Sequence, residues 1–195
     1  MELFDVIKSR RSVRKFSSKK PDWKEIIESI HCAQYAPMAG GIFHMKFLIV
    51  DDKNKIEELA NWSEQSFVAG AKYVVAAVSD PVLVTTPFPK KGETFSHQQA
   101  GAAIQNFLLS LEEFGLGTCW IGHFNDEKVK KVLKIPEGYF IEAMFPIGYS
   151  AEKRISKKKE VKPKSDIYNI LYFNEWLNDR MKKIEKIESR GPEGY

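Results

Sequence analysis

The sequence predicts a single domain in which helices and strands alternate, and three observations support this. Of the 195 residues, 43% are hydrophobic, which is enough to bury a sizeable core. Apolar residues recur at helical spacing in several segments and form short continuous runs in others. A proline or a paired glycine marks where helices should stop, as at Pro37 and at Gly115 and Gly117. We therefore expect one domain over residues 1–195, with about 177–195 as a helical C-terminal tail.

Two helices are predicted near the N-terminus. The first should stop near Arg10, and its apolar face consists of Leu3, Phe4, Val6 and Ile7. For the second, Asp22 and Glu25 are spaced as a capping pair, and Pro37 ends the helix. Its inward residues are expected to be Ile26, Ile27, Ile30 and Ala33.

The next segments predict two strands separated by a helix. Residues 47–50 form a short buried strand, and Asp51 and Asp52 then start a helix that runs to about Phe67. Residues 73–78 are continuously apolar, which predicts a strand covered on both faces. Residues 81–95 hold three prolines and Gly92, and so predict a long irregular loop.

The longest predicted helix covers residues 96–114 and is apolar around most of its circumference. Such a helix is central or lies at a subunit interface. A strand at 118–122, a short helix at 126–133 and a strand at about 141–148 follow it. Residues 149–165 are polar and basic, and residues 166–188 are predicted to be helical again. The Gly115 and Gly117 pair follows a helix and not a strand, which excludes a Rossmann nucleotide site.

Composition and charge exclude several classes of protein. The net charge of +4 is the small difference between 30 basic and 26 acidic residues, much of it in residues 153–164, so no nucleic-acid or membrane partner is predicted. No apolar run approaches the roughly 18 residues of a spanning helix, and we expect a cytoplasmic protein. Cys32 and Cys119 form no CxxC pair, and the four histidines lack metal-ligand spacing, so no metal site is expected.

A cluster of cationic residues follows the first helix. Arg10, Arg11 and Arg14 surround Ser12, and guanidinium groups bind phosphate oxygens two at a time. Lys162 and Lys164 form a second cationic pair, which a compact fold could bring to the same phosphate. The alternative is a solvated helix terminus, stabilised by the helix dipole.

In the order of these segments, the chain resembles the FMN-dependent nitroreductase family over about residues 2–176. The resemblance rests on residues 10–16 (RRSVRKF), 36–41 (APMAGG), 102–122, and 162–164 (KPK) after the Gly-Tyr pair at 148–149. It implies an α+β sandwich with a mixed, mainly antiparallel central sheet flanked by helices. It also implies an intertwined homodimer with one FMN at each of two interface sites.

The resemblance implies a role for each residue that would bind FMN. The phosphate would be held by Arg10, Ser12, Lys162 and Lys164, and Arg11 would assist or contact the ribityl chain. Arg14 would lie at the flavin edge that becomes anionic on reduction, and so favour the reduced form. A backbone amide near Ile121 and Gly122 would donate to flavin N5, and the backbone of Pro37, Met38 and Ala39 would contact the cofactor.

Departures from the family pattern are concentrated in one turn. Met38, Gly41 and Phe43 stand where many members have Ser, Asn and Gln, and Gln99 stands at a usual aspartate. Side-chain hydrogen bonds to FMN would be lost, so weaker or altered binding is expected. Phe43, Phe88 and Phe95 are candidate pocket residues, with ordinary packing as the alternative for the last two. His123 is a candidate proton donor, and a satisfied loop histidine is the alternative.

The predicted function is a flavin-dependent oxidoreductase. Hydride would pass from NADH or NADPH through FMN to a small-molecule acceptor such as a nitroaromatic, a quinone or an enone. The alternative is a non-catalytic flavin- or tetrapyrrole-binding protein on the same scaffold, suggested by the altered turn. A basic nucleic-acid-binding module would explain only residues 153–164, which lack the interleaved aromatic residues that stack on bases.

Overall fold

The computed structural model describes residues 2–152 and 163–177, which belong to two separate units, 1–160 and 161–195. The first unit is built on a four-stranded sheet in the order β1-β2-β4-β3, in which every neighbouring pair is antiparallel. The strands are β1 (Met45–Val50), β2 (Tyr73–Ser79), β3 (Gly117–Thr118) and β4 (Phe140–Gly148). Strands β2 and β4 are central, and β2 is buried throughout, as its continuous apolar run predicts.

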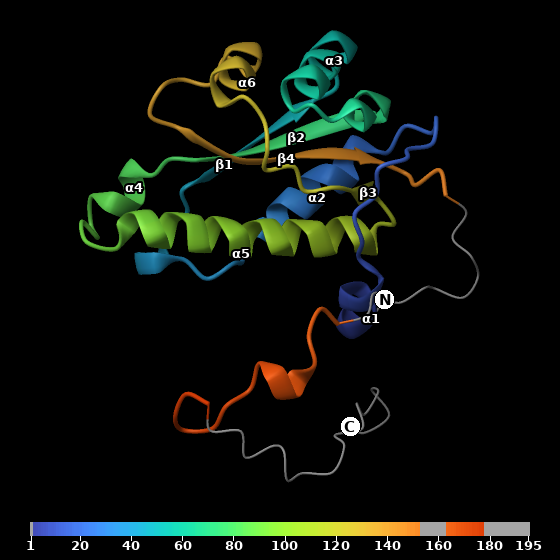
Figure 1. The fold of residues 1–195 in the computed structure, drawn as a ribbon. Coiled ribbons are helices and arrows are strands. Elements are labelled where there is room, and N and C mark those ends of the chain that lie inside the picture. The colour runs from blue at the N-terminus through green and yellow to red at the C-terminus, as the bar shows by residue number, and fades with distance from the viewer. Residues whose placement is uncertain (1, 153–162, 178–195) are drawn as a thin grey trace. The chain divides into compact units, whose positions relative to one another are not determined.

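Helices cover both faces of this sheet (Figure 1). The helices α2 (Trp23–Ala33) and α5 (Gly92–Glu113) pack on one face, and α3 (Lys53–Trp62) and α6 (Asp126–Leu133) lie on the other. Alternate side chains of β2 point to opposite faces of the sheet and enter two separate hydrophobic cores. Tyr73, Val75 and Ala77 belong to the core on the α2 and α5 side. Val74, Ala76 and Val78 belong to the core on the α3 and α6 side. The predicted α+β architecture is therefore confirmed.

The segment after α1 (Leu3–Ser9) makes the sheet mixed. Ser12 forms a parallel bridge with Thr118, whereas Phe16 forms an antiparallel bridge with Ser150. The chain beyond the first helix thus lies along the β3 side of the sheet as an added, irregular strand.

Polar side chains cap the N-termini of α2 and α3, as predicted. Asp22 accepts a hydrogen bond from the Lys24 amide, and Asp52 accepts from the amides of Asn54 and Lys55. The predicted capping pair is only half formed, because one buried oxygen of Glu25 has no partner among the described residues. Ile27 was expected to point inward but is 43% exposed, and so it lies outside the apolar face of α2.

The prediction of a long loop over residues 81–95 is wrong. A short helix, α4 (Val82–Thr85), follows Pro81, and α5 begins at Gly92 and not at Ser96. A Cβ atom on Gly92 would lie 2.5 Å from Cα of Thr85, so α4 and the start of α5 are in backbone contact. The glycine that was interpreted as a loop residue permits this close approach of two helices.

Two further elements are shorter than predicted. Helix α3 ends at Trp62 and not near Phe67, and a 3₁₀-helix, η2 (Ser66–Gly70), follows it. The Ser63 hydroxyl donates to the Leu59 carbonyl, which ends the last turn of α3. Of the strand predicted over 118–122, only the start forms, as β3, which ends at Thr118. Ile121 then pairs with Met144 through an isolated bridge.

The second unit contradicts the helix predicted over residues 166–188, as far as it is described. Between residues 163 and 177 the only helical element is one 3₁₀ turn, η3 (Ile167–Asn169). The remainder of that prediction, and the helical tail over about 177–195 beyond Leu177, lies outside the described residues.

Candidate functional site

The cationic segment, defined here as residues 10–16, is held against the sheet by backbone hydrogen bonds. Arg10 is the C-terminal cap of α1, and its amide donates to the Val6 carbonyl. The Val13 amide donates to the Thr118 carbonyl at 2.8 Å. These bonds fix the backbone of the segment independently of its charged side chains.

Alternation along the cationic segment separates its apolar anchors from its polar groups. Val13 is buried, whereas Ser12 and Arg14 are exposed. Two glycines make room for the anchors: a Cβ on Gly117 would lie 2.8 Å from Val13, and a Cβ on Gly148 would lie 2.9 Å from Phe16. These glycines let the segment dock closely, so that Ser12 and Arg14 face solvent.

The charges of this segment are only partly compensated. Arg11 lies 3.8 Å from Glu152, and the Arg14 guanidinium lies 5.9 Å from the centroid of the Phe67 ring. Within residues 2–152 and 163–177, neither Arg10 nor Arg14 has a carboxylate partner. The buried Thr118 hydroxyl beside Ser12 also lacks a described partner. Two guanidinium groups and an exposed hydroxyl fit an oxyanion such as phosphate.

The second cationic pair was expected to join this segment. Lys164 is exposed and belongs to the second unit, whereas Lys162 lies outside the described residues. Their convergence with Arg10 and Ser12 on one phosphate stays a prediction.

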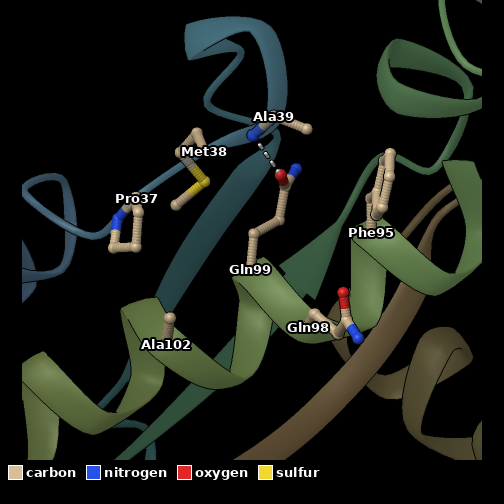
Figure 2. Close-up of a pocket in the computed structure, with 7 residues that line it drawn as sticks. All are labelled: Pro37, Met38, Ala39, Phe95, Gln98, Gln99 and Ala102. Atoms are coloured by element: carbon tan, nitrogen blue, oxygen red, sulfur yellow. Dashed lines mark hydrogen bonds between the residues drawn. The ribbon is translucent and has the colours of Figure 1, made fainter. Parts of the chain in front are cut away.

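An open cavity of about 250 Å³ lies between residues 37–39 and the N-terminal half of α5. Figure 2 shows its lining: Pro37, Met38, Ala39, Phe95, Gln98, Gln99 and Ala102. None of these side chains is charged, and the amides of Gln98 and Gln99 are its polar side-chain groups. Such a lining suits a planar, largely apolar ligand.

The cavity turn, defined here as residues 37–41, owes its shape to two glycines and one long-range hydrogen bond. Gly40 and Gly41 have φ angles of +61° and +69°, which favour glycine. The Ala39 amide donates to Oε1 of Gln99 at 2.9 Å, as Figure 2 shows. This bond ties the cavity turn to α5.

The three predicted pocket phenylalanines have different positions. Phe95 lines the cavity and meets Phe88 edge to face, with ring centroids 5.6 Å apart. Phe88 lies behind the turn, 3.4 Å from where a Cβ on Gly40 would be. Phe43 packs against the core on the α2 and α5 side and is not among the lining residues.

The buried side chain of His44 contacts Gln99, the residue that binds the cavity turn. Nε2 of Gln99 lies 2.9 Å from Nδ1 of His44, and Nε2 of His44 lies 3.1 Å from the Ser96 carbonyl oxygen. His44 is 1% exposed, and burial lowers the pKa of its imidazole. In the sequence, Gln99 stands out only as a departure from the family pattern, and neither its bond to residue 39 nor its contact with His44 is predicted. No motif or spacing in the sequence indicates that residues 44 and 99 are in contact.

The segment from Trp120 to His123 lies beyond β3, on the same side of the sheet as the cationic segment. Ile121 is buried and paired with Met144, whereas Gly122 and His123 are exposed. Trp120 is 43% exposed, with its ring edge to face with Phe145. Within the described part of the chain the His123 ring has no hydrogen-bond partner, so its role as a proton donor stays a prediction.

Among the described residues, no group of three or more His, Cys, Asp or Glu side chains is arranged to hold a metal ion. None of the described helices combines the length and apolar content that crossing a bilayer requires.

The cationic segment and the cavity turn lie toward opposite ends of α5 (Figure 1). The cationic segment pairs with Thr118, just beyond the C-terminal end of the helix, whereas the cavity turn is bound to Gln99 in its second turn. Along the axis, Gln99 is about 21 Å from Glu113, at about 1.5 Å per residue. One chain therefore presents two separate candidate binding regions.

Comparisons with known proteins agree on one family. The model of the Nitroreductase family matches residues 7–70 and 60–149. A relative named iodotyrosine deiodinase, from Thermotoga neapolitana, is 29% identical over 163 residues, covering 75% of this chain and 88% of the relative. A relative named FMN reductase (NADPH), from Bacillus subtilis, is 25% identical over 185 residues, covering 87% and 74%.

Solved structures agree on the fold. A nitroreductase family protein from Clostridium novyi NT is similar with a TM-score of 0.72 and 26% identity, covering 95% of this chain and 100% of that protein. An FMN-dependent nitroreductase from Clostridium difficile R20291 has a TM-score of 0.73 and 25% identity, covering 89% and 99%.

Proposed function

This chain belongs to the nitroreductase family, and we propose that it binds FMN and reduces small organic acceptors with electrons from NADH or NADPH. The observation that carries the proposal is the cationic segment, where the guanidinium groups of Arg10 and Arg14 have no carboxylate partner among the described residues and flank the exposed Ser12. When bound, FMN supplies the redox chemistry, and the acceptors that suit it are nitroaromatics, quinones and enones.

The residues of the cationic segment would bind and bias the cofactor. Arg10 and Ser12 would hold the phosphate through charge-assisted hydrogen bonds. Arg14 would place positive charge beside the flavin edge that becomes anionic on reduction, and its contact with Phe67 would orient the guanidinium group. Backbone amides near Ile121 and Gly122 would approach the ring, with the exposed His123 next to them as a candidate proton donor.

In a homodimer, the cationic segment of one chain and the cavity of the other would be the two half-sites of one FMN site. Within one chain the two half-sites lie about 21 Å apart along α5, so a single compact ligand cannot contact both of them. Two copies related by a twofold axis across α5 would bring the cationic segment of one chain to the cavity of the other. The face of α1 supports this arrangement, because Leu3, Phe4 and Ile7 are 67%, 46% and 47% exposed. We therefore propose the intertwined dimer, with FMN sites at its interface.

Reductive dehalogenation is a second candidate, because a relative bears the name iodotyrosine deiodinase. That reaction replaces a carbon–iodine bond with carbon–hydrogen, consumes two electrons and one proton, and releases iodide. The uncharged lining of the cavity favours neutral acceptors over a zwitterionic amino acid.

An absorption spectrum of the purified protein tests the proposal first. We expect the bands of oxidised flavin, their bleaching by NADH or NADPH without oxygen, and their return when a quinone is added. Iodide release from iodotyrosine under the same conditions would favour dehalogenation. Flavin that neither nicotinamide reduces, or a bound tetrapyrrole, would favour the non-catalytic alternative. Failure to bind FMN at millimolar concentration would contradict the proposal.

A further inference from the structure

The hydrogen bonds of the cavity turn determine the tautomer of His44. The Ser96 carbonyl oxygen can only accept, so Nε2 of His44 carries a proton. The Ala39 amide can only donate, so the Gln99 atom that faces it is the carbonyl Oε1. The amide nitrogen of Gln99 therefore donates to Nδ1 of His44, which must be unprotonated. Of these three bonds, only the one in which Nδ1 accepts from Gln99 requires a neutral imidazole, because an imidazolium would still donate from Nε2 to the Ser96 carbonyl.

A proton on Nδ1 cannot be accommodated by turning the Gln99 amide over. In the present orientation, the new N–H would face the amide nitrogen of Gln99, and two donors would meet. In the reversed orientation, the Gln99 oxygen could accept from the imidazolium, but its NH₂ group would then face the Ala39 amide. Either way one buried hydrogen bond is lost. The reversed orientation gains a charge-assisted bond from the imidazolium to the Gln99 oxygen and is favoured, so the bond that is lost is the one between Ala39 and Gln99, which ties the cavity turn to α5.

We propose that Gln99 and His44 are positioning residues that hold the cavity turn in place only while His44 is neutral, so that protonation of His44 weakens binding in the cavity. The inference rests on the proposed function in that FMN is the ligand measured. Neither side chain takes part in the reaction, because His44 is fully enclosed and the Gln99 amide is engaged on both sides.

The charged and titratable groups around His44 come from three elements. Glu142 on β4 and Asp80 after β2 favour the imidazolium, whereas His97 on α5 opposes it. Glu142 is already engaged, since it accepts from the Ser79 hydroxyl at 2.6 Å and lies 3.1 Å from Nδ1 of His97. Burial outweighs these charges and lowers the pKa of His44 from its usual value of about 6.5. The turn should therefore be held fully near pH 7.5 and released as the pH falls below 6.5 toward the lowered pKa.

Three variants separate this mechanism from a general effect of acid. His44→Gln keeps an acceptor for Gln99 but removes the titrating group. Gln99→Glu offers a carboxylate that accepts from both the Ala39 amide and an imidazolium, so it should hold the turn better in acid. His97→Gln is the matched control, because His97 lies on the same helix and contacts Glu142 but is half-exposed.

The experiment measures the FMN dissociation constant of each protein from pH 7.5 to pH 5. Between these limits we expect the wild type and His97→Gln to lose about fivefold to tenfold more affinity than His44→Gln, the effect of one hydrogen bond. Gln99→Glu should lose less than His44→Gln. Comparison among variants cancels the titration of the FMN phosphate itself. Equal pH profiles in all four proteins would overturn the inference while leaving FMN binding intact.

A second measurement does not depend on FMN. In flavin-free protein, NMR should show the Nε2–H tautomer of His44 at pH 7.5. Hydrogen exchange at the Ala39 amide, corrected for its intrinsic pH dependence, should lose protection in acid in the wild type but not in Gln99→Glu. This result would support the inference even if FMN binding failed, whereas an Nδ1–H tautomer or a pH-independent Ala39 protection would overturn it.

Discussion

The cationic segment and the cavity turn differ in what holds them. Backbone bonds to the sheet hold the first, so its polar side chains are free to meet a ligand. The second is held by the side-chain amide of Gln99, which is 60 residues from Ala39 in sequence and is itself hydrogen-bonded to the buried imidazole of His44. The first half-site is therefore fixed by the fold itself, whereas single substitutions at distant positions can change the second.

The difference bears on specificity. The cationic segment carries chemistry that suits any phosphate-bearing cofactor of this kind, and its neighbours are glycines that close approach requires. The cavity turn lacks the polar side chains that the family pattern has at 38 and 41, and Phe43 just beyond it replaces another. Hydrogen bonds through Gln99 and His44 position the turn instead. We infer that the two ends of α5 are under different constraints, one for cofactor anchoring and one for ligand shape.

The largest expected effect is on the cationic segment. Replacing Arg10 and Ser12 together by Ala should weaken FMN binding by about a hundredfold to a thousandfold, because one charge-assisted and one neutral hydrogen bond to the phosphate are lost. Fluorescence titration of flavin-free protein measures this, and the remaining affinity should depend less on salt. Lys15→Ala is the control, since Lys15 is an exposed cation of the same segment to which no contact with FMN is assigned. An equal loss in the control would mean that only the general positive charge matters.

A smaller effect is expected from Gly117→Ala, which tests whether the segment must dock closely. The added methyl would lie 2.8 Å from Val13, and overpacking of this kind costs about 1–3 kcal/mol of stability. Thermal unfolding should show the loss, and FMN binding should weaken as the segment moves. Gly70→Ala is the control, because nothing lies within 4 Å of its added atom. Unchanged stability in Gly117→Ala would contradict the docking argument.

The smallest effect concerns the cavity turn. Gly41→Asn restores an amide that the family pattern has, and it should tighten FMN up to about tenfold by one or two hydrogen bonds. Asn tolerates the φ of +69°, and an added Cβ meets nothing within 4 Å. In the control, Gly40→Asn, the added Cβ would touch Phe88 at 3.4 Å. If Gly41→Asn binds FMN equally or more weakly, the turn is built for a different ligand geometry.

Much of the fold could be predicted because its causes are local. The central strand β2 is apolar without interruption, and the caps at Asp22 and Asp52 precede their helices directly. The resemblance to the nitroreductase family is confirmed by the family match, as is the α+β fold by the solved structures. The cationic segment could be recognised since its residues are adjacent in sequence.

The rest depends on contacts between distant residues. Gly92 was interpreted as a loop residue, because nothing nearby shows that Thr85 packs against it. The helix predicted from residue 166 has an amphipathic pattern, but among residues 163–177 only the 3₁₀ turn η3 forms. The contact between Gln99 and His44 joins two elements 55 residues apart, so only the folded structure could reveal it.

The central claim is that one flavin is bound by the cationic segment of one chain and the cavity turn of another. Mixed dimers test it most directly, made by co-expressing a chain carrying Arg10→Ala and Ser12→Ala with a differently tagged chain carrying Met38→Asp, which places a carboxylate in the apolar cavity. Each variant alone should bind FMN at least about a hundredfold more weakly than the wild type, and so retain no flavin at micromolar concentration. The mixed dimer should regain roughly one flavin per dimer, because one of its two symmetry-related sites is then assembled from unaltered halves. A mixed dimer that binds no flavin, while each variant remains folded and dimeric, would contradict the account.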